Sequence, residues 1–323
     1  MFDKFYKLSG LPFLLTPDSR FFFGSSGHSR AIAHLVYGLS QQEGFIVITG
    51  EVGAGKTTLV EQMWSQLDRN TYVMARVVTT QVSGDDLLRL AMANFGLGET
   101  RGTDKATLLR EFEQMVREQR KQGRRCLLVV DEVQNLSLAA MEELRMLSNI
   151  TVDGRASVQT ILLGQPQFRP ILASKDVEQL RQRVLASYHL GPLTETETRG
   201  YIEHRLRTVG WKNDPEWGDD AFTALHRNTG GIPRRINTLC SRVLLFGALE
   251  ELHAIDAAIV DATAEELRQD LGDGLAAPVP AARAEPDELE RRIETLERLA
   301  ARQERVSRRI LDLLEAKAAG EAA

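Results

Sequence analysis

Short apolar runs alternate with amphipathic segments over the first 193 residues of this chain of 323 residues. The apolar runs are rich in Val, Ile and Leu and have the length of strands. The segments between them repeat apolar residues every three to four positions, as helices do. Strands that alternate with helices predict βαβ units and a mainly parallel sheet. We expect strands at 45–49, 72–78, 126–132, 157–164 and 186–193, and helices at 29–42, 56–67, 83–95, 104–121 and 138–149.

The pattern changes near residue 194. The tetrapeptide Thr-Glu-Thr-Glu at 194–197 matches a capping box, with Thr194 as N-cap and Glu197 at N3. From there to about residue 270 the periodicity predicts helices only. The fold class is therefore predicted to be α/β, with a parallel-sheet domain at 1–193 followed by a small all-helical domain at 194–271. Its helices are expected at 195–209, 219–228, 233–250 and 256–271.

The first 30 residues are rich in aromatic side chains and turns, and we include them in the first domain. Phe21, Phe22 and Phe23 are expected to pack against that domain. Contact of these rings with the base of a ligand is the alternative.

The composition changes again after residue 271. Residues 272–287 are rich in Gly, Ala and Pro, which is typical of a linker. Residues 288–323 form a charged tail, with helical spacing of apolar residues over 288–317 that Gln303 interrupts. A short coiled coil for self-association or partner docking is one interpretation, and a solvated helix is the other.

Charge and composition narrow the classes of function. The chain is 43% apolar and 26% charged, as globular proteins are, and its formal net charge is -5. Strong polyanion binders are usually basic, so nucleic acid is not expected as the main partner. The chain lacks the pattern of a signal peptide or a membrane helix, which predicts a soluble, cytoplasmic protein. Cys126 and Cys240 are expected to be buried thiols.

The segment GEVGAGKT at 50–57 fits the P-loop pattern G-x-x-x-x-G-K-[ST] in full, between a predicted strand and a predicted helix. Gly53 and Gly55 let the backbone turn, so that its N–H groups and the helix N-terminus can form a cradle for phosphates. Lys56 is expected to reach the β- and γ-phosphates of ATP, and Thr57 to bind Mg²⁺ through its hydroxyl. The predicted nucleotide-binding residues are Gly50, Glu51, Val52, Gly53, Ala54, Gly55, Lys56, Thr57 and Thr58.

Two adjacent acids, Asp131 and Glu132, end the third apolar run. In a P-loop ATPase the metal needs an acid at the end of a neighbouring strand, and Asp131 fits that place. Glu132 is the candidate general base that polarises the attacking water. The alternative is that the two acids lie at an exposed strand end and have no catalytic or metal-binding role. Gln134 and Asn135 are interpreted as turn and cap residues, and Ser137 as the N-cap of the next helix.

Gln165 follows the fourth predicted strand. Its side chain is expected to emerge beside Asp131 at the same edge of the sheet, where it can orient the water or the γ-phosphate. The alternative is that Gln165 caps the helix started by Pro166.

Two groups of arginines follow, Arg181 with Arg183 and Arg234 with Arg235. Arginines can stabilise the charge of a phosphoryl-transfer transition state. Ordinary surface arginines are the alternative.

Together these motifs resemble those of AAA+ ATPases. More narrowly, the chain resembles the ExeA/GspA-type secretion ATPases over roughly residues 1–265. The resemblance rests on FYKLSGLPFLLTPDSRFFF, GFIVITGEVGAGKTTL, LLVVDEVQNL, LLGQPQF, LRQRV, LGPLTETET and GGIPRRIN. Within that group the chain looks closest to the ATPases of exosortase (PEP-CTERM)-associated exopolysaccharide gene clusters.

The resemblance implies roles for individual residues. Gln165 matches the sensor-1 position, and Arg234 matches sensor 2 within the motif G-x-x-R. Arg181 or Arg183 matches the region from which an arginine finger enters a neighbouring subunit's site, and we favour Arg183. The resemblance also implies ATP and Mg²⁺ as cofactors, a helical lid after the α/β domain, and a homo-oligomer, often a ring, as the active form.

The chain also departs from the family pattern. ExeA-like proteins commonly continue into a transmembrane helix and a periplasmic peptidoglycan-binding region, whereas a linker and a charged helix follow the lid here. Direct binding to the cell wall is therefore not expected, and any contact with the inner membrane would go through a partner.

The function expected from these observations is ATP hydrolysis that drives or regulates assembly of an envelope secretion or exopolysaccharide system. One alternative is a DNA-acting AAA+ ATPase, such as a transposition helper or an initiator. Initiators usually carry a winged-helix domain after the lid, and residues 272–323 are too short and too charged for one. The other alternative is a nucleotide-dependent switch or scaffold with slow turnover.

Overall fold

The computed structural model describes residues 2–16, 18–78, 83–98, 102–152 and 154–271, and it divides into two compact units. The α/β unit is Asp18–Pro192. The helical unit contains, among the described residues, 2–16 and 193–271. The predicted linker at 272–287 and the charged tail at 288–323 lie outside the described residues, so what we expect of them stays a prediction.

A five-stranded parallel sheet forms the centre of the α/β unit, in the spatial order β2-β3-β6-β1-β7. Strands β1, β3 and β6 are buried along almost their whole length, which explains why their sequences are continuous apolar runs. The strands are β1 (Phe45–Gly50), β2 (Tyr72–Val78), β3 (Arg125–Asp131), β6 (Val158–Gly164) and β7 (Val184–Leu190), which confirms the five predicted strands.

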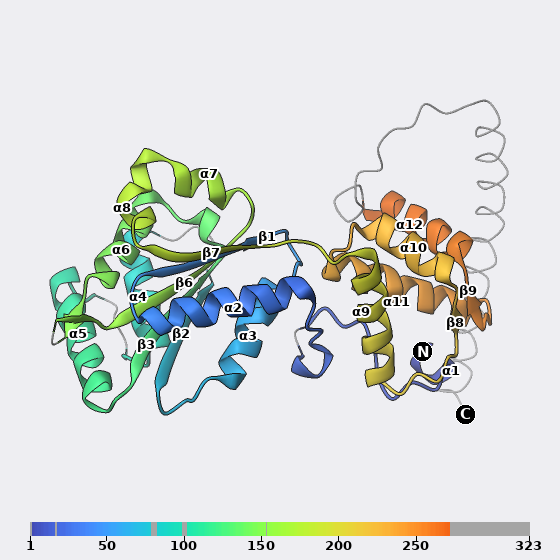
Figure 1. Ribbon diagram of the computed structural model, residues 1–323, viewed down its shortest axis with the longest axis horizontal. Coiled ribbons are helices and arrows are strands. Elements are labelled where there is room, and N and C mark those ends of the chain that lie inside the picture. Colours follow the sequence, from blue (N-terminus) through green and yellow to red (C-terminus); the bar gives the residue numbers. More distant parts are fainter. Residues whose placement is uncertain (1, 17, 79–82, 99–101, 153, 272–323) are drawn as a thin grey trace, which may run out of the picture. The chain divides into compact units, whose positions relative to one another are not determined.

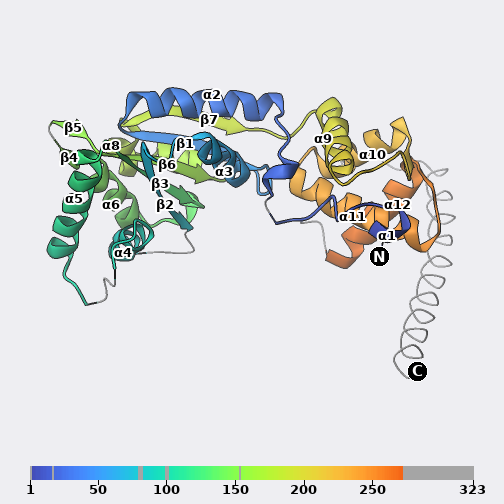
Figure 2. The ribbon, with the colours of Figure 1, turned by 90° about the horizontal axis from the view of Figure 1, so that it is seen from below.

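Helices cover both faces of this sheet (Figure 1). Because successive strand residues point to opposite faces, Ile46 and Ile48 pack with α2 and α3, whereas Val47 packs with α4, α5 and α6. Figure 2 shows these two layers from the side, with α2 on one side of the sheet and α5 and α6 on the other. The helices are α2 (Ser26–Gln41), α3 (Lys56–Gln66), α4 (Gly84–Asn94), α5 (Lys105–Lys121) and α6 (Leu138–Ser148).

Several short elements of the α/β unit were not predicted. They contain two to six residues, which is too short for a hydrophobic period to be recognised. They are the 3-10 turns η1 (Ser19–Phe21), η2 (Val133–Asn135) and η3 (Lys175–Val177), the paired strands β4 (Thr151–Val152) and β5 (Arg155–Ala156), and the helices α7 (Phe168–Ala173) and α8 (Glu178–Arg181).

The helical unit confirms the capping box, since the Thr194 side chain accepts from the Glu197 N–H and the Glu197 carboxylate accepts from the Thr194 N–H. The prediction of helices only is wrong, because β8 (Glu216–Trp217) pairs with β9 (Ala254–Ile255). A strand of two residues is too short to give a recognisable hydrophobic period in the sequence. The helices are α1 (Phe2–Phe5), α9 (Glu195–Thr208), α10 (Asp219–Thr229), α11 (Pro233–Leu249) and α12 (Ala257–Leu271).

The amino-terminal segment 2–16 packs within the helical unit, which corrects the prediction that residues 1–193 form one domain. The buried guanidinium of Arg205 donates to the carbonyl of Pro12 at 2.6 Å, and the Tyr6 hydroxyl donates to the carbonyl of Leu252 at 2.9 Å. These long-range contacts join segments that no local pattern connects. Phe21, by contrast, is buried in the α/β unit, as the packing interpretation expects.

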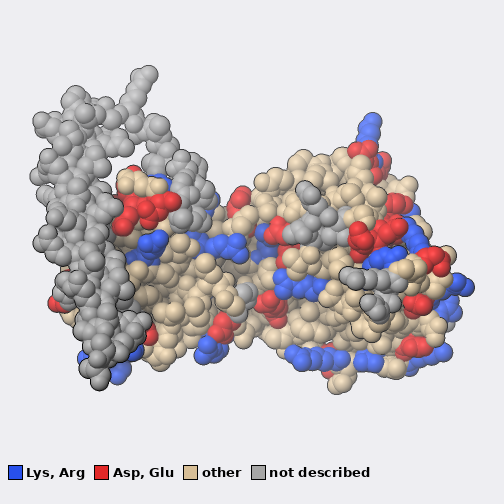
Figure 3. Space-filling model, turned by 180° about the vertical axis from the view of Figure 1, so that it is seen from behind, with Lys and Arg blue, Asp and Glu red and all other residues tan. Residues whose placement is uncertain are grey.

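Basic and acidic side chains are interspersed over the face of the molecule seen in Figure 3. This mixture agrees with the small net charge of the chain. Among the described helices, none has both the length and the apolar character needed to cross a membrane. Cys126 and Cys240 are buried and unpaired, as predicted, and burial raises the pKa of the Cys126 thiol to about 12.

Candidate nucleotide-binding site

The P-loop joins the carboxyl end of β1 to the start of α3. Gly53 and Gly55 have φ angles of 81° and 99°, in a region that side-chain-bearing residues rarely adopt. A Cβ atom at Gly55 would lie 2.9 Å from Nε2 of His28. The two glycines therefore permit a tight loop whose backbone ends at a helix N-terminus, which is the geometry of an anion site.

His28 was missed by the sequence reasoning. It is a buried residue in the first turn of α2, and its Nδ1 lies 2.7 Å from Oγ of Ser25, the N-cap of that helix. The ring of Phe22 meets it edge-on, with centroids 5.7 Å apart. Ser25 and Phe22 therefore hold the imidazole against the P-loop.

Lys56 is buried, and its ammonium donates to the carbonyls of Gly50 at 2.7 Å and Glu51 at 3.0 Å. These neutral acceptors keep the positive charge within the loop. The position is the one that phosphate binding requires of a P-loop lysine.

Thr57 and Asp131 are brought together from two separate elements. The Thr57 hydroxyl, in the first turn of α3, donates to the Asp131 carboxylate at 2.9 Å. Asp131 is buried at the end of β3, as the sequence predicted for a metal-binding acid. Its Oδ2 also accepts from Nη2 of Arg76 on β2 at 3.0 Å, and Arg76 reaches Glu61 on α3 at 3.1 Å. Arg76 was not singled out in the sequence.

Glu132 is held by two glutamine amides. Nε2 of Gln134 donates to Oε2 of Glu132 at 2.6 Å, and Nε2 of Gln165 donates to the same oxygen at 2.9 Å. The backbone N–H of Gln165 in turn donates to Oε1 of Gln134 at 2.9 Å. Glu132 itself has a φ of 55°, a left-handed conformation that is uncommon outside glycine. Two amide donors therefore hold one oxygen of this carboxylate, Oε2, in place.

This network settles two interpretations of polar residues. Gln134 is more than a turn residue, because its side chain joins Glu132 to the backbone of Gln165. The Gln165 side chain reaches Glu132 and does not cap α7, whose N-cap is Gln167. Ser137 is the N-cap of α6, as predicted.

Replacing Gln134 by leucine is expected to lower ATP turnover by about tenfold with little change in nucleotide affinity. The substitution removes one donor from the Glu132 carboxylate, and a hydrogen bond to a charged group contributes about 1.5–3 kcal/mol. Asn135→Ala, at the exposed position of the same turn, is the matched control. Turnover and affinity would be measured by phosphate release and isothermal titration, and equal turnover in both variants would contradict the positioning role.

His189 lies beside the P-loop strand, with its Nδ1 3.1 Å from Oγ1 of Thr49. Partial burial, together with the positive charges of Arg169 and Lys56, lowers the pKa of this imidazole, although Glu51 acts in the opposite direction. This lowering favours the neutral form of the imidazole over the charged form.

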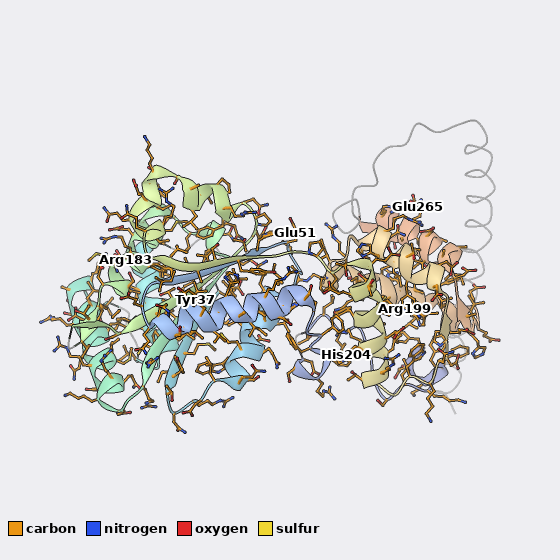
Figure 4. The ribbon with its side chains drawn as sticks, viewed as in Figure 1. Tyr37, Glu51, Arg183, Arg199, His204 and Glu265 are labelled. Carbon is orange, nitrogen blue, oxygen red and sulfur yellow. The ribbon has the colours of Figure 1, made fainter. Side chains whose placement is uncertain are left out.

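The arginines favoured as finger residues lie at the other edge of the sheet. Figure 4 shows Glu51 near the carboxyl end of β1 and Arg183 near the start of β7. The two strands are parallel and pair from Phe45 with Val184 to Gly50 with Leu190, so about 20 Å of strand separates the two edges. Nη1 of Arg183 donates to Oγ of Ser148 at 3.0 Å, and Nη1 of Arg181 to the carbonyl of Ala173 at 3.0 Å. Neither arginine is placed at the P-loop of its own chain.

Arg234 lies in the first turn of α11, in the helical unit, and its side chain is exposed. Pro233 is at the start of that helix, where a backbone N–H has no hydrogen-bond partner within the helix. The N–H that proline lacks is therefore not needed there. The sensor-2 role of Arg234 stays a prediction.

The phosphate cradle, the Thr57–Asp131 pair and the polar residues after β3 and β6 define a P-loop nucleotide-binding protein. Residues 39–172 match the AAA domain family, which agrees with the parallel sheet described above. The chain thus carries an AAA domain.

The chain is also 34% identical over 255 residues to General secretion pathway protein A of Aeromonas hydrophila, an alignment that covers 79% of this chain and 46% of that protein. This match confirms the resemblance to ExeA/GspA-type AAA+ ATPases. The chain spans about half the length of that relative. The narrower likeness to exosortase-associated ATPases stays a prediction.

Two solved structures show the same fold. Cdc6p from Pyrobaculum aerophilum superposes with a TM-score of 0.63 at 15% identity, over 82% of this chain and 70% of that one. The Holliday junction branch migration motor RuvB of Thermotoga maritima gives a TM-score of 0.51 at 20% identity, over 75% and 68%. At these identities the likeness concerns the fold alone.

Proposed function

We propose that this chain hydrolyses ATP to ADP and phosphate with Mg²⁺ as cofactor. The observation that supports this most is the Glu132 carboxylate, held by Gln134 and Gln165 next to the Thr57–Asp131 pair. A protein that only binds nucleotide has no need for a fixed second carboxylate beside the metal-binding acid. The arrangement therefore favours turnover over a slow switch.

The residues present fit ATP and Mg²⁺. The backbone from Gly50 to Gly55 and the start of α3 suit the phosphates, and Lys56 supplies the positive charge. Thr57 and Asp131 provide oxygen ligands, directly or through water, of the kind that Mg²⁺ prefers. When bound, Mg²⁺ neutralises charge on the phosphates.

The roles of the chain's own residues follow from these contacts. Lys56 orients the phosphate chain from within the loop, where neutral carbonyls now hold its ammonium. Glu132 accepts a proton from the attacking water at the carboxylate that Gln134 and Gln165 keep in place. Because Gln165 follows β6 directly, it couples the end of that strand to the position of the base.

The direct test is the steady-state release of phosphate from ATP by the purified chain, with EDTA and the Lys56→Ala variant as blanks. Turnover above both blanks is expected. A chain that binds ATP with Mg²⁺ but releases no phosphate, alone or at high protein concentration, would instead establish the switch or scaffold alternative.

We also propose that the active form is a homo-oligomer in which Arg183 acts on a neighbouring subunit. The two edges of the sheet carry the P-loop and Arg183 separately, so the arginine cannot reach the P-loop of its own chain. Contact between the carboxyl edge of one subunit and the amino edge of the next would complete the site.

Mixing two inactive variants tests this arrangement. Arg183→Ala is expected to lower turnover by about 1,000-fold, as loss of an arginine finger does. An equal mixture with Glu132→Gln is expected to regain about a quarter of the parent activity, since one interface in four then has an intact base and an intact arginine. Arg181→Ala is the matched variant. On its own it is expected to keep turnover. Loss of turnover in Arg181→Ala alone, with recovery after mixing with Glu132→Gln, would move the role to Arg181, and no recovery in the mixture with Arg183→Ala would contradict the trans arrangement.

We propose further that hydrolysis serves an envelope secretion or exopolysaccharide system, from the cytoplasmic side and through partner proteins. Support comes from the relative named General secretion pathway protein A. In the organism that encodes this chain, a chromosomal Glu132→Gln allele is expected to block export of an envelope protein or polysaccharide. Unchanged amounts of exported protein and polysaccharide would contradict this assignment.

A further inference from the structure

A polar cavity opens at the amino edge of the sheet, opposite the P-loop. It has a volume of about 210 Å³ and lies among the starts of β2, β3 and β6, the end of α2 and the end of α5. Ligands of parallel α/β sheets usually bind at the carboxyl edge, where the P-loop is, so this cavity is separate from the nucleotide site. Its polar lining includes Gln42, Tyr72, Arg120, Arg124, Arg125 and Ser157.

Three guanidinium groups surround this cavity. Arg120 extends from the last turn of α5, Arg124 lies just before the start of β3, and Arg125 is the first residue of that strand. All three are half-buried. No described residue that lines the cavity is acidic, although the chain as a whole has more acidic than basic residues. The cavity therefore concentrates a formal charge of +3 within a surface that is otherwise mixed.

Neutral oxygens hold these guanidiniums in place. Nη1 of Arg120 donates to the carbonyl of Ala156 at 3.3 Å and approaches Oγ of Ser157 at 3.4 Å. Nη1 of Arg125 lies 3.4 Å from the Tyr72 hydroxyl, and its guanidinium stacks over the Tyr72 ring at 5.8 Å.

The side-chain oxygens of Gln42 and Gln122 are further neutral acceptors for these guanidiniums. With its amide oriented as the neighbouring donors require, Gln42 accepts from both terminal nitrogens of Arg125, at 3.2 and 2.8 Å. Arg124 donates to the side chain of Gln122. Within the described part of the chain, none of the three arginines forms an ion pair with a carboxylate. Their positions are thus fixed while their charge stays uncompensated.

We propose that this cavity is a binding site for a phosphate group, as a phosphate monoester or a diphosphate. Planar guanidiniums recognise phosphate oxygens through paired hydrogen bonds. Three guanidiniums suit a ligand with two or more negative charges better than they suit a ligand with one carboxylate. The volume is below the ~300–1,000 Å³ of sites for drug-sized ligands, so it suits a small anion or the charged end of a larger molecule.

Isothermal titration with sodium phosphate and pyrophosphate tests this site. The P-loop is also expected to bind phosphate on the proposed function, so it is silenced in two independent ways, by saturation with ADP in metal-free buffer and by the Lys56→Ala substitution. Binding is expected in both backgrounds at constant ionic strength. Arg124→Gln and Arg125→Gln are each expected to weaken it by about tenfold or more, since hydrogen bonds to charged groups are lost.

Arg117→Gln is the matched control, because Arg117 is an exposed arginine of α5 that does not line the cavity. Thermal unfolding and ADP affinity verify that each variant is folded. Arg124→Glu gives a second readout, since reversing a half-exposed charge is expected to abolish binding while the fold is kept.

The phosphate group could belong to a free ligand or to a lipid headgroup. Binding of the protein to vesicles of phosphatidylcholine, with and without added phosphatidic acid, distinguishes these two sources. Binding of pyrophosphate in solution assigns a free phosphate ligand. Binding only to vesicles that contain phosphatidic acid, lost in the same arginine variants, assigns a lipid headgroup. No binding in either arm, binding equal in all arginine variants, or binding of citrate in preference to pyrophosphate overturns the proposal.

Discussion

Replacing Glu132 by glutamine is expected to lower the ATP turnover number by about 100- to 10,000-fold, the usual contribution of a general base. The glutamine amide has nearly the shape of the carboxylate but cannot accept a proton from water. ATP affinity is expected to stay close to that of the parent, because Lys56 bonds to the loop carbonyls and Thr57 to Asp131, in both cases without Glu132. Single-turnover phosphate release and equilibrium nucleotide titration measure the two quantities separately.

Glu111→Gln makes the same chemical change at an exposed position of α5 and is expected to alter neither quantity. Hydrolysis by Glu132→Gln at the parent rate would show that another group activates the water. A parallel loss of ATP affinity and turnover would instead mean that Glu132 supports the shape of the loop.

Replacing Lys56 by alanine is expected to weaken ATP binding by about 100-fold or more and to remove measurable turnover. The ammonium is buried in the loop, and its two hydrogen bonds go to loop carbonyls that phosphate oxygens can replace. Loss of two charge-assisted hydrogen bonds at about 1.5–3 kcal/mol each accounts for an effect of this size. The affinity is measured by titration with a fluorescent ATP analogue in the presence of Mg²⁺.

Lys121→Ala, at the exposed end of α5, is the control for loss of a positive charge. Because Lys56 is also buried in the fold, thermal unfolding of the variant separates a loss of binding from a loss of structure. A well-folded Lys56→Ala protein that binds ATP as tightly as the parent would refute the role of this lysine.

The parts of the site that could be predicted from sequence are those that a short segment determines by itself. The P-loop needs only a buried strand, two glycines with positive φ and a helix, and all of these lie within residues 45–66. Asp131 was placed correctly because the end of a parallel strand determines the edge at which its last residue emerges.

The parts that could not be predicted depend on contacts across the fold. His28 meets Gly55 only because α2 lies on the same face of the sheet as α3. Gln134 has the sequence of a turn residue, and its bond to Gln165 depends on β3 and β6 being neighbours. Segment 2–16 was assigned to the wrong domain because its partner, Arg205, lies about 190 residues further along the chain.

The separation of the P-loop and Arg183 onto opposite edges of one sheet has a consequence for the symmetry of the assembly. On the proposed trans arrangement, a two-fold dimer completes both of its sites only if the axis brings each P-loop to the arginine of the other subunit. A head-to-tail contact, by contrast, joins two different surfaces and is heterologous. Repetition of such a contact gives a closed ring if the rotation between subunits closes, and an open helical filament if it does not. An open assembly always ends with one P-loop that has no arginine and one arginine that has no P-loop.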